Sequence, residues 1–377
     1  MRRLPRGRLP APPAGQGLIV DFNDIRLSVE QAEASLEAAD RLSLPRSGWA
    51  SGRFDMLAIS GGAAGGAYGA GALVGLTEAG QRPEFALVTG VSTGALIAPF
   101  AFLGPAWDER LTDAYVGGHA ADLLSLRQLA SSFTGGLFRG EALDALIHPF
   151  VDEALIDAVA AEHARGRRLL VATTDLDSQR SCIWDMGAIA AHGGDKAVAL
   201  FREVLAASAS LPGLFPPRRI PCAFEGGQFE EMHVDGGVAA PLFLMPEGLL
   251  RWNRLGRRLH RGRVHVLVNT VLEPEPRTTA PNVAAVLTRS FDAMLRFSYR
   301  QALGTATTFC AAQGLPISVA SIPDAPDQGG MLSFDTDTMK RLFDAARERA
   351  RSGELWRSPV AERQGLQGLM DRLRPRG

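Results

Sequence analysis

The strongest candidate for a chemically reactive residue in this sequence is Ser92, at the centre of a Gly-x-Ser-x-Gly motif, GVSTG at residues 90–94. An apolar run at 85–88 precedes the motif, and apolar, helix-forming residues at 95–103 follow it. A strand–turn–helix setting of this kind is typical of a nucleophile elbow, in which the turn exposes the serine hydroxyl. The two glycines of the motif leave room for the sharp reversal, and the following helix N-terminus favours negative charge. The pattern therefore predicts Ser92 as a nucleophile.

A second turn, nearly without side chains, lies upstream: SGGAAGGAYGAG at residues 60–71, directly after an apolar run at 56–59. It holds no lysine for a P-loop and no Gly-x-Gly-x-x-Gly spacing for a dinucleotide. The later glycines suit close packing of a helix on a strand, while the earlier ones suit a backbone that approaches an anion. We predict an oxyanion hole made of backbone N–H groups, those of Gly61, Gly62, Ala63 and Thr93.

An acidic residue, Asp235, follows an alternating strand pattern at residues 229–234 and precedes two glycines. A carboxylate at a strand end, flanked by glycines, can approach a serine without steric hindrance. From these residues alone an ordinary Asp-Gly turn is favoured; together with the elbow and the ordered motifs, a role as general base is favoured. We single out Gly236 and His233 for a supporting role. His233 falls on the same strand face as Asp235, where it would either orient the carboxylate or serve only the structure, the structural role being favoured.

Four segments, in one order, carry a resemblance to a known family: SGG with GAYGAG at 60–71, GVSTG at 90–94, ASASLPGLFPP at 207–217 and DGG at 235–237. Together they resemble the patatin-like phospholipases, with bacterial members of that family as the nearest likeness. The resemblance implies a lipid acyl hydrolase with a Ser92–Asp235 dyad, in which Asp235 is the base without a histidine. The third of these segments, rich in proline, is expected to form the floor of an acyl pocket.

One segment departs from the family pattern. The glycine-rich loop usually carries a third glycine and a polar side chain, and here these positions are Ala63 and Gly65. A backbone N–H donor survives a change from glycine to alanine where φ is negative. We therefore expect a working but less well shaped oxyanion hole if Ala63 has a negative φ.

Other functions compete with the dyad. Ser92, Asp235 and His265 occur in the chain order of an α/β-hydrolase triad, so a Ser-Asp-His esterase is one alternative. A weakened relative that binds lipid or regulates another protein is a second, suggested by Ala63 and Gly65. Transfer of the acyl group to an alcohol instead of water is a third.

Composition excludes several other classes. The net charge of −1 argues against a nucleic-acid partner, and the three widely spaced cysteines are expected to be buried thiols. No metal-ligand pattern is evident, and we expect neither metal nor cofactor.

No apolar run is long enough for a membrane span, and residues 1–16 lack the apolar core of a secretory signal, so a cytoplasmic location is expected. Six arginines between residues 251 and 263 suggest peripheral contact with a membrane, or simply a solvated helix face.

We expect a three-layer α/β/α domain of the patatin-like fold, with a mixed, mostly parallel central sheet and the elbow at the carboxyl ends of its strands. This acyl hydrolase domain is predicted at 51–345, after an N-terminal extension (1–50, with 1–16 disordered) and before a basic tail (346–377). Strands are predicted at 167–174, 181–186, 263–268 and 317–320, and helices at 28–42, 196–207, 282–313 and 335–351. Pro99 is expected to kink or shorten the helix after the elbow.

Overall fold

The computed structural model describes residues 2–3, 18–22, 24–27, 54–120, 140–224, 227–244, 262–273, 276, 278–323 and 333–359. Within this part of the chain eleven strands form one sheet. The main path runs through β11 (Ile317–Ile322), β10 (Gly262–Val271), β4 (Phe54–Ile59), β5 (Phe85–Val91), β6 (Arg168–Asp175), β9 (Gly227–Asp235), β8 (Arg218–Phe224) and β2 (Leu18–Ile19). Beside this path, β7 (Arg180–Asp185) pairs with β6, β3 (Arg26–Leu27) with β7, and β1 (Arg2–Arg3) with β9.

The sheet is mixed, as expected. From β11 to β6 all neighbouring strands are parallel, and β9, β8, β7, β3 and β2 join in antiparallel pairs. The parallel centre is buried on both faces: Leu57 and Ile59 of β4 pack in one apolar core, while Met56 and Ala58 pack in a second core on the opposite face. A strand of this kind reads as a continuous apolar run, which is why 56–59 lacks polar residues.

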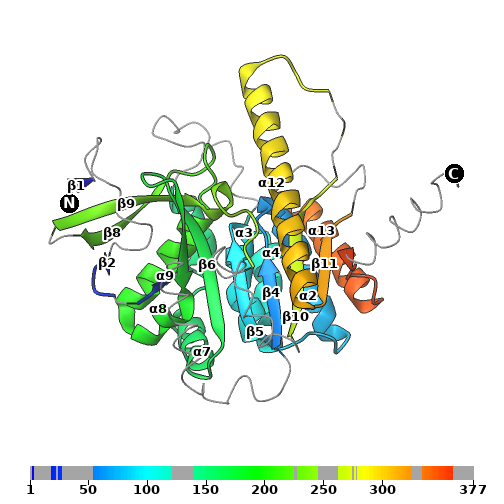
Figure 1. The fold of residues 1–377 in the computed structure, drawn as a ribbon, viewed down its shortest axis with the longest axis horizontal. Helices are drawn as coiled ribbons and strands as arrows, with labels where there is room; N and C mark the ends of the chain where they lie inside the picture. Colours follow the sequence, from blue (N-terminus) through cyan, green and yellow to red (C-terminus); the bar gives the residue numbers. More distant parts are fainter. Residues whose placement is uncertain are drawn as a thin grey trace, which may run out of the picture.

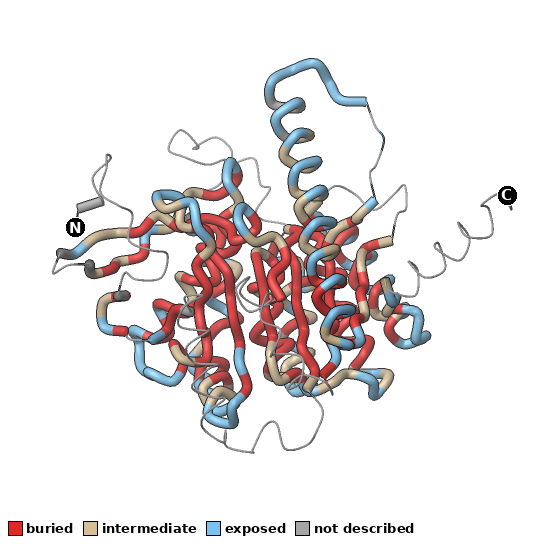
Figure 2. The backbone as a smooth tube through the Cα atoms, viewed as in Figure 1, coloured by how far each residue is buried: buried red, intermediate tan, exposed pale blue. Residues whose placement is uncertain are grey.

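Helices cover both faces of the sheet and complete the three predicted layers (Figure 1). The larger core packs under helices on one face: α2 (Gly66–Glu78), α3 (Thr93–Leu103), α4 (Asp108–Val116), α6 (Gly140–Ile147), α7 (Glu153–Ala164), α8 (Met186–His192), α9 (Gly194–Ser208) and α13 (Thr336–Arg351). On the other face α12 (Val283–Gln313) packs on the smaller core. Figure 2 shows the buried strands at the centre between these layers.

Helix α12 is continuous through Gly304 for 31 residues. It begins where the side chain of Asn282 accepts a hydrogen bond from the N–H of Ala285, and it ends at Gly314, which is left-handed. The lower part of the helix lies against the sheet, whereas its first turns rise above the body of the protein and are exposed (Figures 1 and 2).

Several predictions about single segments can be compared with the structure. Pro99 does not end its helix, because α3 continues to Leu103. Helix α13 continues past the expected boundary at 345, and Leu355 beyond it is buried. In the segment 1–16, Arg2–Arg3 are paired as β1. The helix predicted at 28–42 and the arginines from 251 to 261 lie outside the described residues. Among the described helices, none is both long and apolar enough to cross a bilayer.

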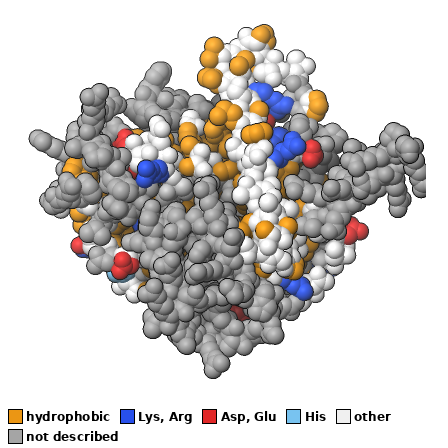
Figure 3. Space-filling model, viewed as in Figure 1, with side chains coloured by type: hydrophobic (Ala, Val, Ile, Leu, Met, Phe, Trp, Pro, Cys, Tyr) orange, Lys and Arg blue, Asp and Glu red, His pale blue; other side chains and the backbone are white. Residues whose placement is uncertain are grey.

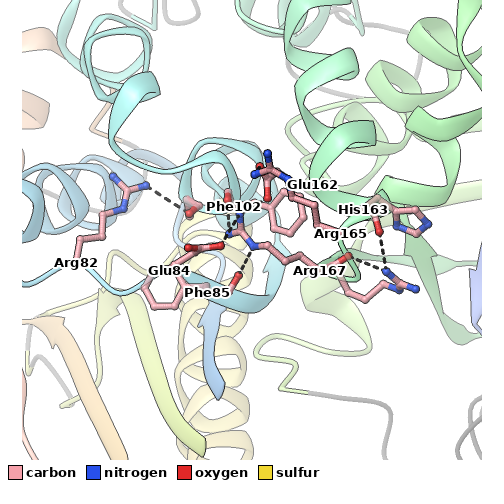
Figure 4. A network of polar contacts seen from close by, with 10 residues as sticks. Arg82, Glu84, Phe85, Phe102, Glu162, His163, Arg165 and Arg167 are labelled. Atoms are coloured by element: carbon pink, nitrogen blue, oxygen red, sulfur yellow. Dashed lines mark hydrogen bonds and ion pairs between the residues drawn. The ribbon is translucent and has the colours of Figure 1, made fainter. Parts of the chain in front are cut away.

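A buried arginine, Arg167, joins the strand before the GVSTG motif to the helix after it, at the ends that lie away from the motif (Figure 4). Its guanidinium donates to the carbonyl oxygen of Phe85, at the start of β5, and to that of Phe102, near the end of α3. It also pairs with Glu162 of α7 at 2.9 Å. One side chain therefore ties together the strand that enters the motif, the helix that leaves it and the neighbouring helix.

Candidate active site

The turn at Ser92 has the backbone of a nucleophile elbow. Ser92 has φ 57° and ψ −129°, a conformation that side chains rarely adopt, between the end of β5 and the first turn of α3. Gly90 and Gly94 make the reversal possible: a Cβ on Gly90 would lie 2.5 Å from the carbonyl oxygen of Gly94, and one on Gly94 would lie 2.4 Å from that of Ile59. The predicted strand–turn–helix is present.

The elbow is supported from behind by Ser208, the last residue of α9. The backbone N–H of Ser92 donates to Ser208 Oγ at 3.0 Å, and Ser208 Oγ donates to the carbonyl oxygen of Ala172 at 2.7 Å. Because this N–H is already bonded, it is not available to an oxyanion. The adjacent N–H, that of Thr93, belongs to the first turn of α3, where backbone N–H groups have no partner within the helix.

Asp235 lies at the carboxyl end of β9, is buried, and lines the same cavity as Ser92. Its Oδ1 accepts a hydrogen bond from the N–H of Gly237 at 2.7 Å, so the turn that the two following glycines form holds the carboxylate in place. Gly236 is required for close approach to β6, because a Cβ there would lie 2.2 Å from the carbonyl oxygen of Ala172. Burial raises the pKa of Asp235 to about 6, against the opposing effect of the nearby Ser92 hydroxyl and of the hydrogen bond from the N–H of Gly237.

The glycine-rich loop lies directly beside the elbow. A Cβ on Gly61 would lie 2.9 Å from the Cβ of Ser92, and Gly62, Ala63 and Thr93 line one cavity together with Ser92 and Asp235. Ala63, however, has φ +50°, so the condition of a negative φ is not met. The chain takes a left-handed conformation there that costs an alanine about 1 kcal/mol.

Asn269 at the end of β10 holds this loop, and nothing in the sequence pointed to it. Its backbone N–H donates to Ser60 Oγ and its Nδ2 donates to the carbonyl oxygen of Ser60, both at 2.9 Å. Cβ atoms on Gly62 and Gly65 would lie 2.0 and 2.1 Å from the carbonyl oxygen of Asn269. The backbone of β10 thus occupies the space that a polar side chain at position 65 would need.

An apolar cavity opens over Ser92 and Asp235. The residues that line it come from the loop, α3, α6, α12, the Pro-rich segment after α9 and the residues just before α13. They include Leu96, Leu143, Leu146, Leu211, Leu214, Phe215, Phe291, Leu295, Tyr299 and Phe334. A second cavity shares Ala63, Thr93, Leu96, Leu146 and Phe334 with the first. As predicted, residues of the segment 207–217 form part of the wall.

A comparison with models of protein families finds a match over half of the chain. The family model described as patatin-like phospholipase matches residues 57–246. This chain belongs to the patatin-like phospholipase family. Family membership supports hydrolysis of lipids as its general activity. A search among curated proteins finds no significant match in sequence.

Two solved structures resemble this patatin-like protein in fold, each with 13% sequence identity. VipD from Legionella pneumophila has a TM-score of 0.39, over 78% of this chain and 67% of VipD. Human GIVD cytosolic phospholipase A2 has a TM-score of 0.35, over 73% of this chain and 50% of the human chain, so the chain spans half the length of that enzyme.

The two histidines considered for this patatin-like site, His233 and His265, bond to groups other than Ser92 and Asp235. The two ring nitrogens of His233 bond to Thr173 Oγ1 at 2.9 Å and to Glu231 Oε2 at 3.0 Å instead of to Asp235. His265 bonds to Asp55 at 2.9 Å, near the start of β4. This pair therefore lies at the amino ends of the parallel strands, whereas Ser92 follows the carboxyl end of β5. The arrangement therefore does not form the Ser92–Asp235–His265 triad considered above.

Other polar groups of the patatin-like domain have structural roles. The acids after β6 form a turn, with the N–H of Asp177 donating to Asp175 Oδ1 at 3.1 Å. Among the described residues, no group of three or more histidine, cysteine or acidic side chains is placed to hold a metal. The three cysteines are free and buried, as predicted.

Tyr299 of α12 is the residue that sequence reasoning missed most directly. It lines the cavity, and burial and the charge of Asp235 raise the pKa of its hydroxyl.

Proposed function

We propose that the protein is a serine acyl hydrolase of the lipase or phospholipase A type, which cleaves lipid acyl esters with a Ser92–Asp235 dyad. The observation that carries the proposal is that Ser92, on a strained elbow, and the buried carboxylate of Asp235 line the same apolar cavity. A hydroxyl at such a turn can be approached by an ester carbonyl from the cavity, while its proton faces the carboxylate.

In the first half of the reaction, Ser92 Oγ attacks the ester carbonyl carbon and its proton passes to the carboxylate of Asp235. The carbonyl oxygen becomes an oxyanion, which the N–H groups of Gly61, Gly62, Ala63 and Thr93 stabilise. The tetrahedral intermediate then expels the alcohol, which takes the proton from Asp235 as it leaves. The product of this half-reaction is an acyl group esterified to Ser92.

In the second half, Asp235 accepts a proton from a water molecule as the water attacks the acyl-serine carbonyl. A second oxyanion forms in the same site, and its collapse returns the proton to Ser92 Oγ and releases the fatty acid. A carboxylate is a weak base for a hydroxyl, even with the pKa of Asp235 raised to about 6. Much of the barrier reduction must therefore come from the oxyanion hole, where one donor is typically worth about 10²–10³ in turnover.

The shape and polarity of the cavity favour a long acyl chain over a small polar ester. Its walls are mostly leucine and phenylalanine, and the adjoining cavity continues the apolar surface past Leu96 and Leu146. Burying apolar substrate there contributes roughly 0.8 kcal/mol for each methylene group. We expect a preference for longer chains that appears in KM before it appears in kcat.

The test is hydrolysis of short- and long-chain p-nitrophenyl esters by the wild type and by Ser92→Ala, Asp235→Asn and His265→Ala. Loss of activity in the first two with retention in His265→Ala is the expected result. Near wild-type activity in Ser92→Ala would remove Ser92 from the mechanism, and retained activity in Asp235→Asn would remove Asp235. Equal loss in Asp235→Asn and His265→Ala, with all proteins folded by circular dichroism, would favour a triad.

One observation favours a second candidate, a weakened relative that binds lipid with little turnover: the left-handed backbone of Ala63 in the loop proposed to hold the oxyanion. A fluorophosphonate probe separates the two candidates. An active dyad reacts with the probe in a one-to-one ratio at Ser92, whereas a site whose serine is not activated stays unlabelled.

A further inference from the structure

Helix α12 carries an exposed apolar surface, which we call the α12 stripe: Val283, Val286, Leu287, Met294 and Phe297. These side chains are between 48% and 76% exposed. Of the large apolar side chains exposed in the described residues, only Leu176 and Val238 lie elsewhere. With 3.6 residues per helical turn, the five side chains fall within an arc of about 100°. Figure 3 shows apolar side chains gathered along the part of α12 that rises above the body.

The α12 stripe borders the active-site cavity. The next arc around the same helix carries Phe291, Leu295 and Tyr299, which line the cavity with Ser92 and Asp235. Phe291 follows Leu287 by one turn, so the exposed apolar surface continues without interruption into the apolar wall of the cavity. An exposed apolar patch of this extent marks an interaction site more often than a random feature of a surface.

The charged side chains of α12 lie on the remaining side of the helix. They are three arginines and one aspartate, Arg289, Arg296, Arg300 and Asp292. Asp292 accepts from Arg289 at 3.0 Å and pairs with Arg296 at 3.4 Å, and the helix carries three arginines against this one aspartate. An apolar face beside an arginine-bearing face is the pattern of a helix that lies in a membrane interface, its apolar side in the acyl region and its arginines at the headgroups.

We infer that the α12 stripe binds the surface of a lipid bilayer that contains anionic headgroups. This inference rests on the proposed function, because a hydrolase of lipid esters must take its substrate from such a surface. The helix lies on the bilayer and does not cross it, since its charges lie along one side and no described helix meets the requirements for a span. A lipid then passes from the bilayer along Phe291 and Leu295 to Ser92 without exposing its acyl chains to water.

The experiment is flotation with vesicles of phosphatidylcholine and phosphatidylglycerol in equal amounts. The protein carries Ser92→Ala so that it does not consume the vesicles. In this background Leu287→Ser, Met294→Ser and Phe297→Ser are combined, and the matched control is Leu176→Ser, an exposed apolar residue in the turn between β6 and β7. We expect the triple variant to lose vesicle binding by about tenfold or more, because three side chains lose their burial in lipid; the control should bind like its parent.

A second measurement separates this inference from the proposed function. With Ser92 restored, the triple variant should hydrolyse water-soluble p-nitrophenyl butyrate like the wild type and lose activity on vesicles of the same composition. Flotation of the triple variant equal to that of its parent, or no flotation of the parent, would overturn the inference even if the esterase assay succeeds. So would light scattering that shows a dimer of the parent and a monomer of the triple variant, because a second copy would then occupy the stripe.

Discussion

The backbone N–H of Ser92 donates its hydrogen bond to the side chain of Ser208, 116 residues later in the chain. Ser208 passes the connection on to the carbonyl oxygen of Ala172 in β6. An elbow with φ 57° is strained and must be held by its surroundings, and this pair supplies part of that support. Within the segment 207–217, Ser208 therefore supports the backbone at Ser92, while Leu211, Leu214 and Phe215 line the cavity.

Replacing Ser208 by alanine should loosen the elbow. The partly buried N–H of Ser92 would lose its acceptor, at a cost of about 1 kcal/mol. We expect a lower melting temperature and a kcat for soluble esters reduced by about tenfold, with KM little changed. Ser210→Ala is the matched control, since the hydroxyl of Ser210 bonds only to the preceding turn of its own segment, at the carbonyl oxygen of Ala206. Equal losses of kcat in the two variants would contradict a specific role for Ser208.

The pH dependence of hydrolysis should report Asp235. This group accepts a proton only as a carboxylate, and burial raises its pKa to about 6. Activity should therefore fall as pH drops below about 6 and level off above it, which kcat/KM measured from about pH 4.5 to 8 would show. Circular dichroism across the same range controls for unfolding. A flat profile down to pH 5 would show that the pKa of the base is not raised.

The same carboxylate should lower stability at neutral pH. Its pKa is higher in the folded than in the unfolded protein, so its contribution to the free energy of unfolding decreases as pH rises from about 4 to about 6. Asp235→Asn keeps the oxygen that accepts from Gly237 and removes the charge. We expect this variant to be more stable than the wild type at pH 7, by about 2–3 kcal/mol, and of similar stability at pH 4. Urea denaturation at both values tests this, and equal stability at pH 7 would contradict it.

Ala63→Gly should improve the loop beside Ser92. Glycine adopts φ +50° without the cost that alanine incurs, although its greater freedom in the unfolded chain takes back part of the gain. We expect stability equal to or slightly above that of the wild type, and a faster kcat. The neighbouring variant Ala64→Gly is the control: this buried residue lies in the 3-10 helix at Ala63–Gly65 without a positive φ, and it should lose about 1 kcal/mol. A loss of kcat in Ala63→Gly would show that the alanine conformation is needed.

Asn269→Ala should reduce turnover without removing any group that contacts substrate. The variant loses the hydrogen bond from Nδ2 to the carbonyl oxygen of Ser60, at the start of the loop proposed to hold the oxyanion. Because that loop acts mainly in the transition state, we expect kcat to fall about tenfold and KM to stay nearly constant. Asn282→Ala, at the exposed start of α12, should leave both constants unchanged. A change confined to KM would point to substrate binding instead.

The elements around Ser92 could be predicted because their signals are local. An apolar run, a turn of glycines and an apolar helical segment follow one another within twenty residues, and β5 and α3 lie where that order places them. The long helix at 282–313 was predictable for the same reason, since periodicity repeats within a few residues. Asp235 was different: its own surroundings favoured an ordinary turn, and only the order of four motifs drew attention to it.

The sequence by itself determined the elbow and the long helix α12, because these depend on residues close together in the chain, and it indicated the family through four short motifs in a fixed order. Only the tertiary structure decided that Asn269 holds Ser60 from 209 residues away, that Ser208 supports Ser92, and that Tyr299 enters the cavity. It also decided that His265 pairs with Asp55 instead of the dyad, and that Ala63 is left-handed. The physical reason is that each of these depends on how β10, α9 and α12 pack around the loop and the elbow, and a contact between distant segments leaves no pattern in the residues on either side of it.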